Sequence, residues 1–305
     1  MPALDSRFRG NNCINQTKPS VTFLRPLMQW TDAGFVVALR RHGESATIVE
    51  LLTREHGRHL GLVRGGQSPK LRAVLQPGNE VAAVWRGRLS EHLGSFACEL
   101  VRAHAARFID DPDRLAGLAA AAALIAAALP EREPHADIFA SFAALLATLD
   151  SARDWPAHYV GWECSLLAAL GFGLELARCA VTGTATDLAY VSPRSGRAVS
   201  REAGRPYHDK LLPLPDFLWR DAPSDQVQIA LGLQLTEHFL SHHVLLPQGR
   251  TLPAARSRLT ARLRQAPRAD TFDSRAQSVI PAQAGIQGNG SGGDAGPPPT
   301  RRRRL

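Results

Sequence analysis

GFVVALRRHG at residues 34–43 is the first of five short apolar runs in this sequence. The others are TIVELLT at 47–53, RHLGLVR at 58–64, EVAAVWR at 80–86 and FACELVR at 96–102. Glycine-containing turns separate the runs. Within the runs, apolar side chains alternate with smaller or polar ones, as Phe35, Val37 and Leu39 do, and this period of two predicts that they share one buried face of the strand. Short strands at this spacing predict a small all-β sandwich or barrel.

Positive charge gathers on the same stretch, at the strand ends and in the connecting loops. Between residues 34 and 102 there are ten Lys and Arg residues against six Glu residues. Five strands that close into a small barrel with cationic loops are the plan of an oligonucleotide-binding (OB) fold. The candidate nucleic-acid contacts are Arg40, Arg41, Arg54, Arg58, Arg64, Lys70, Arg72, Arg86 and Arg88. The alternative is a solvated basic rim without a ligand.

The connection between the third and fourth runs begins with two glycines at 65–66, which allow backbone paths closed to other residues. No Gly-Lys-Ser/Thr follows them, so this is not a phosphate-binding P-loop. We interpret it as a mobile loop that presents Lys70 and Arg72 to a phosphate backbone. Arg54 and Arg58 flank the third strand, and we expect all four cations to converge on one rim.

Length and composition limit the possible functions. The chain has 305 residues and a formal net charge of +8, of which Arg301–Arg304 supply four. The length indicates about two domains, and no apolar run approaches the ~20 residues of a membrane span. Without an apolar export signal we expect a cytoplasmic protein with reduced cysteines. Concentrated basic patches favour a polyanion over an acidic small molecule as partner.

The chain is predicted to be an α+β protein built from four segments. Residues 1–27 are polar and aperiodic, and we predict that they are an extension upstream of a natural start at Met28. Residues 28–107 form the OB barrel. Residues 108–265 form a helical domain with an irregular hairpin insert at 176–215. Residues 266–305 are rich in Gly and Pro and are predicted to be a disordered tail.

Alanine- and leucine-rich segments predict the helices of the second domain. Asp111 and Pro112 provide a start signal, with an acidic N-cap and a proline in the first turn. Helices are expected at 115–129, 135–149, 156–170, 224–246 and 253–263, and their short connections indicate a bundle. The last helix and the residue after it carry a second basic face, formed by Arg256, Arg258, Arg262 and Arg264.

Metal and cofactor motifs are weak. The four cysteines, Cys13, Cys98, Cys164 and Cys179, show no CxxC spacing. His238 and His242 have the i, i+4 spacing of a zinc pair, but Phe239 stands where the metalloprotease motif has Glu. We interpret them as packed or exposed histidines. Nucleotide-binding and nucleophile motifs are also missing, so no cofactor and no enzymatic reaction are predicted.

An ordered series of short motifs resembles the RecO family of bacterial DNA repair proteins. The series is GFVV at 34–37, RHGESA at 41–46, LTREHGR at 52–58, VRGG at 63–66, LQPGN at 75–79, LGFGLEL at 170–176 with Cys179, RPY at 205–207, LLPLP at 211–215 and HFL at 238–240. The resemblance covers residues 28–246 in order. The series as a whole is specific, although no single motif is diagnostic.

The resemblance implies an N-terminal OB barrel and a C-terminal helical domain. It implies binding of single- and double-stranded DNA and annealing of complementary strands. It also implies help in loading the RecA recombinase onto DNA coated with single-strand-binding protein, with RecR as the usual partner. On this basis we expect a DNA repair mediator.

Some family members hold a zinc ion with four cysteines in the C-terminal insert. Here Cys179 matches, but Thr182 occupies the second position and the hairpin at 190–200 has no cysteine. Zinc is therefore not expected, and packing is expected to hold the hairpin.

Trp85 is expected inside the barrel, with base stacking as the alternative.

Two other classes of function stay open from the sequence. One is an adaptor whose barrel binds protein and not DNA, and salt-dependent DNA binding separates it from the mediator. The other is a metal-dependent enzyme that uses His238 and His242, and metal analysis of the purified protein tests it.

Overall fold

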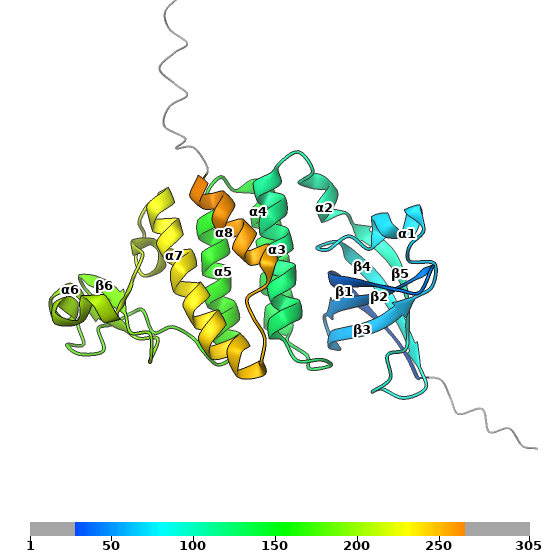
Figure 1. Ribbon diagram of the computed structural model, residues 1–305, viewed down its shortest axis with the longest axis horizontal. Helices are drawn as coiled ribbons and strands as arrows, with labels where there is room; N and C mark the ends of the chain where they lie inside the picture. Colours follow the sequence, from blue (N-terminus) through cyan, green and yellow to red (C-terminus); the bar gives the residue numbers. More distant parts are fainter. Residues whose placement is uncertain (1–27, 266–305) are drawn as a thin grey trace, which may run out of the picture. The chain divides into compact units, whose positions relative to one another are not determined.

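The computed structural model describes residues 28–265, which form a β-barrel followed by a helical domain (Figure 1). The α+β class predicted from the sequence is confirmed. The predicted extension at 1–27 and the predicted tail at 266–305 lie outside the described residues. Among residues 28–265, no helix is both long and apolar enough to cross a membrane. The domain boundary at 107 and 108 stays a prediction.

Five strands close the barrel in the order β1-β2-β3-β5-β4. Their bounds are β1 Met28–His42, β2 Ala46–Thr53, β3 Gly57–Val63, β4 Glu80–Gly87 and β5 Ser95–Arg102. The five predicted strands are therefore confirmed, and β1 is longer than its predicted run. Its first half pairs with β4, from Met28 opposite Gly87, and its second half pairs with β2, up to His42 opposite Ala46. This five-stranded barrel has the OB architecture.

A β-bulge interrupts the pairing of β1 with β2. Val36 is opposite Leu51 and Ala38 is opposite Glu50, so Val37 is an extra residue without a partner. Because side chains alternate between the two faces of a strand, one extra residue exchanges the faces of every position that follows.

The bulge sets the direction of Leu39. Leu39 is opposite Val49, which belongs to the barrel core, and cross-strand partners share a face. Phe35 and Val37 instead pack into the core of the helical domain. The sequence-based prediction that Phe35, Val37 and Leu39 share one buried face is therefore wrong. Leu39 turns to the open end of the barrel and keeps 40% of its surface exposed.

Aromatic side chains fill the barrel around Trp85. Trp85 is fully buried, and its indole Nε1 donates to Leu93 O at 3.2 Å. Trp30 stacks on it with ring centroids 5.8 Å apart, and Phe96 belongs to the same core cluster. The prediction that Trp85 lies inside the barrel is confirmed, so it is not free to stack on a base.

The connection from β3 to β4 contains a short helix, α1 Pro69–Val74, where the sequence was interpreted as a mobile loop. Ser68 caps the helix by accepting from Leu71 N, and Pro69 occupies its first turn. Asn79 closes the other end, since its Nδ2 donates to Ala73 O and Val74 O. The loop interpretation is wrong, because Ser68 and Pro69 start a helix directly after the two glycines.

The helical domain contains the predicted helices with small shifts. The longer helices are α3 Pro112–Ala128, α4 Ala136–Ser151, α5 Trp155–Ala169, α7 Gln226–Phe239 and α8 Ala254–Gln265, and α2 His104–Arg107 follows the barrel. Asp111 caps α3 as predicted, accepting from Asp113 N and Arg114 N. The helix predicted at 224–246 changes at Phe239 into a π-helical segment, Leu240–Leu245, which is followed by a 3-10 turn, Leu246–Gln248.

The insert is a small sheet packed against the helical domain. Its elements are β6 Leu188–Val191, β7 Ala198–Ser200, β8 Leu212–Pro213, α6 Arg201–Gly204 and two 3-10 turns, Arg205–Lys210 and Asp216–Leu218. The predicted hairpin corresponds to β6 and β7. Leu188, Val191 and Ala198 are buried in the same core as the helices, so apolar packing attaches the insert.

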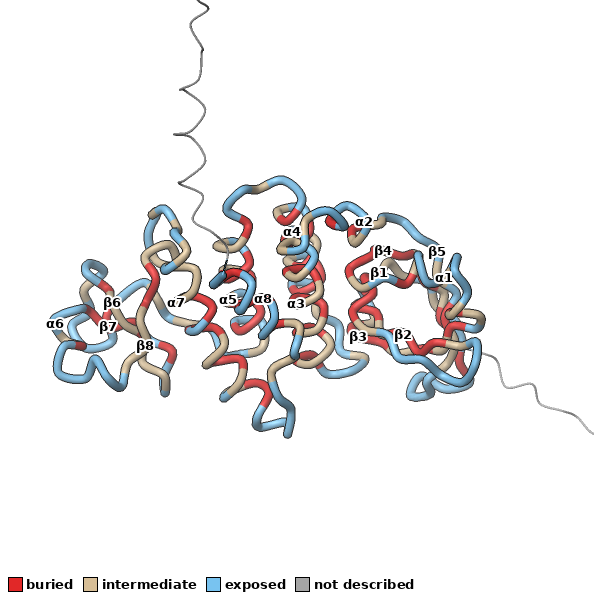
Figure 2. The backbone as a smooth tube through the Cα atoms, turned by 45° about the horizontal axis from the view of Figure 1, so that its top comes forward, coloured by how far each residue is buried: buried red, intermediate tan, exposed pale blue. Residues whose placement is uncertain are grey.

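The outer face of β1 and β2 packs against the helical domain. Phe35 lies between Phe139 and Phe142, with ring centroids 5.0 Å and 5.2 Å away. Leu52 of β2 joins the same cluster. Buried residues run along the barrel strands and the inner faces of the helices, while many connections are exposed (Figure 2). Part of the sheet surface that OB folds use for ligands is therefore covered.

Candidate nucleic-acid interface

Strand pairing brings three of the predicted contacts to one end of the barrel. Arg40 and Arg41 end β1, where Arg41 is opposite Thr47 of β2. Thr47 is in turn opposite Val63, the last residue of β3, and Arg64 follows directly. The end of β1, the start of β2 and the end of β3 therefore lie side by side.

Gln67 attaches α1 to the same end. Its backbone N–H donates to Ser45 O at 3.1 Å, and its side-chain Nε2 donates to Ala46 O at 3.0 Å. These bonds hold the segment before α1 against the β1–β2 turn. Lys70 and Arg72 of α1 are both exposed there.

We call this set the cationic rim: Arg40, Arg41, Arg64, Lys70 and Arg72. All five side chains are exposed, and among residues 28–265 none of them takes part in an ion pair. Elsewhere in the described chain, arginines of both the barrel and the helical domain are paired with carboxylates. Unpaired cations gathered in one place form a surface for a polyanion.

A cavity of about 250 Å³ opens within the cationic rim, between the end of β1 and α1. Arg41 and Arg72 line it from opposite elements, and Leu39 lies beside Arg41. The apolar pattern of the sequence does not predict this cavity, because the bulge that turns Leu39 toward it is not visible in that pattern.

Three other predicted contacts lie away from the cationic rim. Arg86 lies near the end of β4 and Arg88 follows that strand, which pairs with the start of β1. Arg86 Nε donates to Gln29 Oε1 at 2.8 Å. Arg54 follows β2, with its guanidinium 5.2 Å from the centre of the Phe139 ring. The prediction that Arg54, Arg58, Lys70 and Arg72 converge is wrong, because the two pairs flank opposite ends of β3, about 20 Å apart at ~3.3 Å per residue.

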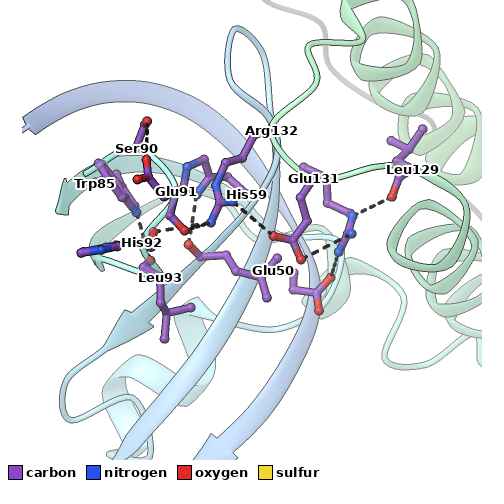
Figure 3. Close-up of polar contacts among 12 residues, drawn as sticks. Glu50, His59, Trp85, Ser90, Glu91, His92, Leu93, Leu129, Glu131 and Arg132 are labelled. Carbon is purple, nitrogen blue, oxygen red and sulfur yellow. Dashed lines mark hydrogen bonds and ion pairs between the residues drawn. The ribbon is translucent and has the colours of Figure 1, made fainter. Parts of the chain in front are cut away.

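Arg58 is buried, with 5% of its surface exposed, and its guanidinium holds the barrel to the helical domain. Nε donates to Leu129 O at 2.9 Å, and Nη1 pairs with Glu50 Oε2 at 2.7 Å. Figure 3 shows these partners together with Glu131, whose carboxylate lies 3.7 Å from Nη2. The prediction that Arg58 contacts nucleic acid is therefore corrected: its donors are used inside the protein.

The connection from α3 to α4 extends this attachment to the β4–β5 loop. Arg132 adopts φ of 62°, its N–H donates to Arg58 O at 2.8 Å, and its Nη2 donates to Glu91 O at 2.9 Å (Figure 3). Gly57, at φ +67°, permits the close approach, since a Cβ there would lie 2.0 Å from Glu133 O. The β4–β5 loop, which binds ligands in many OB folds, is anchored here.

The second basic face predicted on the last helix is smaller than predicted. Arg256 is completely buried and pairs with Glu163 of α5. Arg262 pairs with Asp113 at 2.7 Å. Arg258 and Arg264 stay exposed, so two of the four arginines are used within the protein.

The histidine pair and the insert cysteine do not form a metal cluster. His238 and His242 stack with ring centroids 4.4 Å apart, and burial together with His242 lowers the pKa of His238. Residues 28–265 contain no group of three or more His, Cys, Asp or Glu side chains suited to a metal. Burial opposes ionisation of the Cys179 thiol, but N–H donors from Ser200 and Thr182 lower its pKa to about 6.

The closed five-stranded barrel with α1 between β3 and β4, joined to a helical domain, defines an OB-fold protein with a cationic rim. Residues 28–104 match the family model described as recombination protein O N terminal, and residues 109–251 match recombination protein O C terminal. Together the two matches include the barrel and most of the helical domain.

Curated relatives named DNA repair protein RecO are similar along nearly their whole length. The protein from Rhodospirillum rubrum is 52% identical over 251 residues, which cover 80% of this chain and 100% of the relative. The one from Rhodospirillum centenum is 51% identical over 241 residues, covering 78% and 96%. The one from Phenylobacterium zucineum is 51% identical over 242 residues, covering 79% and 100%. This chain belongs to the RecO family and has a role in DNA repair and recombination.

Proposed function

We propose that this protein binds single- and double-stranded DNA, anneals complementary strands and helps load RecA onto DNA coated with single-strand-binding protein, with RecR as its partner. The observation that carries the proposal is the cationic rim, five exposed cations at one end of an OB barrel that form no ion pair with any residue between 28 and 265. Annealing needs no bond chemistry. It needs two polyanions brought together while a cationic surface screens their repulsion.

The test is an annealing assay on complementary strands coated with single-strand-binding protein, with and without RecR. We expect annealing without added nucleotide or metal, because the sequence has no P-loop and the described residues form no metal cluster. A strict requirement for ATP or zinc would contradict the proposal. Salt-independent binding, or no DNA binding at all, would favour the adaptor instead.

Replacing Lys70 and Arg72 with alanine should weaken binding to single-stranded DNA and make it less dependent on salt. Each phosphate contact contributes about −0.7 to the slope of log K against log salt on single strands, so losing two should flatten the slope by about 1.4. The effect should be equal across sequences, since phosphate contacts carry no base information. Fluorescence anisotropy titrations over a range of salt concentrations measure both quantities.

The matched control is a variant with Arg258 and Arg264 replaced by alanine, which removes the same number of exposed cations from α8. It should keep the wild-type affinity and slope. If this control loses both while the Lys70 and Arg72 variant keeps them, the DNA contact lies on the helical domain. Arg54, Arg86 and Arg88 stay proposed secondary contacts at the other end of the barrel.

A further inference from the structure

The cavity within the cationic rim has an apolar floor and a cationic edge. Leu39 supplies the accessible apolar side, with 40% of its surface exposed, while Leu75 also lines the cavity but keeps only 1% of its surface exposed. Arg41 and Arg72 stand at the edge on different elements, without an ion pair among the described residues. The volume is about 250 Å³, below the range of about 300–1,000 Å³ typical of drug-sized ligands.

A β-bulge and two glutamine side chains position the residues that line the cavity. The bulge at Val37 turns both Leu39 and Arg41 to the cavity side, since these residues are two positions apart. Gln67 lines the cavity and is held by its bonds to the β1–β2 turn. Gln76 Nε2 donates to Arg72 O at 2.8 Å, which ties the far wall to α1.

An apolar recess bordered by two free guanidinium groups suits one part of a nucleic-acid strand. Every base has an apolar face that gains from leaving water, whatever its hydrogen-bonding edge. Guanidinium groups bind phosphate oxygens through paired N–H donors. A ligand with both chemistries at close spacing, and a size suited to a small cavity, is a single nucleotide.

We propose that this cavity takes the base of one nucleotide of a bound single strand, with Leu39 against the base and Arg41 and Arg72 on the neighbouring phosphates. The inference rests on the proposed DNA binding and adds a base contact to it. In duplex DNA the bases are stacked and paired, so the cavity favours unpaired strands. The site reads no sequence, because apolar contact is possible with all four bases.

The experiment compares a labelled oligothymidine with the same strand carrying abasic residues, which keep every phosphate and lose the bases. Wild-type protein should bind the natural strand more tightly. The L39A variant should lose about five- to tenfold in affinity for the natural strand, as expected for removing a leucine side chain from an apolar contact, and much less for the abasic strand. Its salt slope should equal that of the wild type, because no phosphate contact is removed.

Two further variants isolate the base contact. L39M keeps an apolar side chain of similar volume and should restore the preference for the natural strand. L115A removes a leucine of similar exposure from α3, outside the cavity, and should behave as wild type. Thermal unfolding followed by circular dichroism checks that all three variants are folded.

The outcomes separate this inference from the proposed function. If L39A loses equal affinity for both strands, or loses none, the base site is wrong while salt-dependent DNA binding stands. An acidic peptide as the true occupant of the cavity would give that same equality. If the wild type shows no salt-dependent DNA binding, both the base site and the proposed function fail.

Discussion

Replacing Glu163 with alanine is expected to lower the free energy of unfolding by about 3–5 kcal/mol, the loss found when one partner of a buried ion pair is removed. Glu163 and Arg256 both have no exposed side-chain surface. Two guanidinium nitrogens of Arg256 contact the carboxylate, Nη2 at 2.8 Å from Oε2, and Nη2 also donates to Leu233 O at 3.0 Å. Without Glu163 the buried cation loses its counter-charge.

Urea denaturation followed by circular dichroism measures this loss, and two controls define its origin. Replacing Asp113 with alanine breaks the partly exposed pair with Arg262 and should change stability by less than ~1 kcal/mol. The double variant with Glu163→Leu and Arg256→Met removes both buried charges and should recover most of the stability. If Glu163→Ala lost no more than Asp113→Ala, the buried pair would not hold α8 in place.

Arg58→Ala should lower the stability and leave the salt slope of DNA binding unchanged, whereas Arg64→Ala should do the reverse. Arg58 belongs to β3 and Arg64 follows it directly. Arg58→Ala leaves Leu129 O and Glu50 without their guanidinium partner, so we expect a loss of about 2–3 kcal/mol in unfolding free energy. Its salt slope for DNA should stay at the wild-type value. Arg64→Ala should change stability by less than ~0.5 kcal/mol and flatten the slope by about 0.7.

The two measurements on the two variants form one crossed test. Urea denaturation reports the attachment of the barrel to the helical domain, and anisotropy titrations across salt concentrations report phosphate contacts. A flattened salt slope in an Arg58→Ala protein of unchanged stability would show that Arg58 contacts DNA after all. An unchanged salt slope in Arg64→Ala would show that Arg64 makes no phosphate contact.

The strands and the main helices could be predicted from the sequence because their signals are local. Apolar residues with a period of two, separated by glycine turns, identify β2 to β5, and Asp111 with Pro112 identifies the start of α3. The short helix α1 was missed, although Ser68 and Pro69 provide its start signal. A helix of six residues is too short for its periodicity to be recognised.

The use of each charged side chain could not be predicted, because its partner lies far away in the sequence. Arg58 and Leu129 are 71 positions apart, and Arg256 and Glu163 are 93 positions apart. The local sequence does not distinguish an arginine that is paired in the interior from one that is exposed and unpaired. Only the packing of the barrel against the helices distinguishes Arg58 from Arg64.

The bulge at Val37 has a consequence for aligning this chain with its relatives. Arg40 and Arg41 are adjacent, yet the extra residue before them determines that Arg41 lines the cavity. If a relative that lacks the extra residue is aligned without a gap, the side chain placed against Arg40 would face the cavity and the one placed against Arg41 would face outward. Alignments should therefore place a one-residue gap at Val37 where a relative has no bulge. The equivalent cation should then be sought by strand register and not by residue identity.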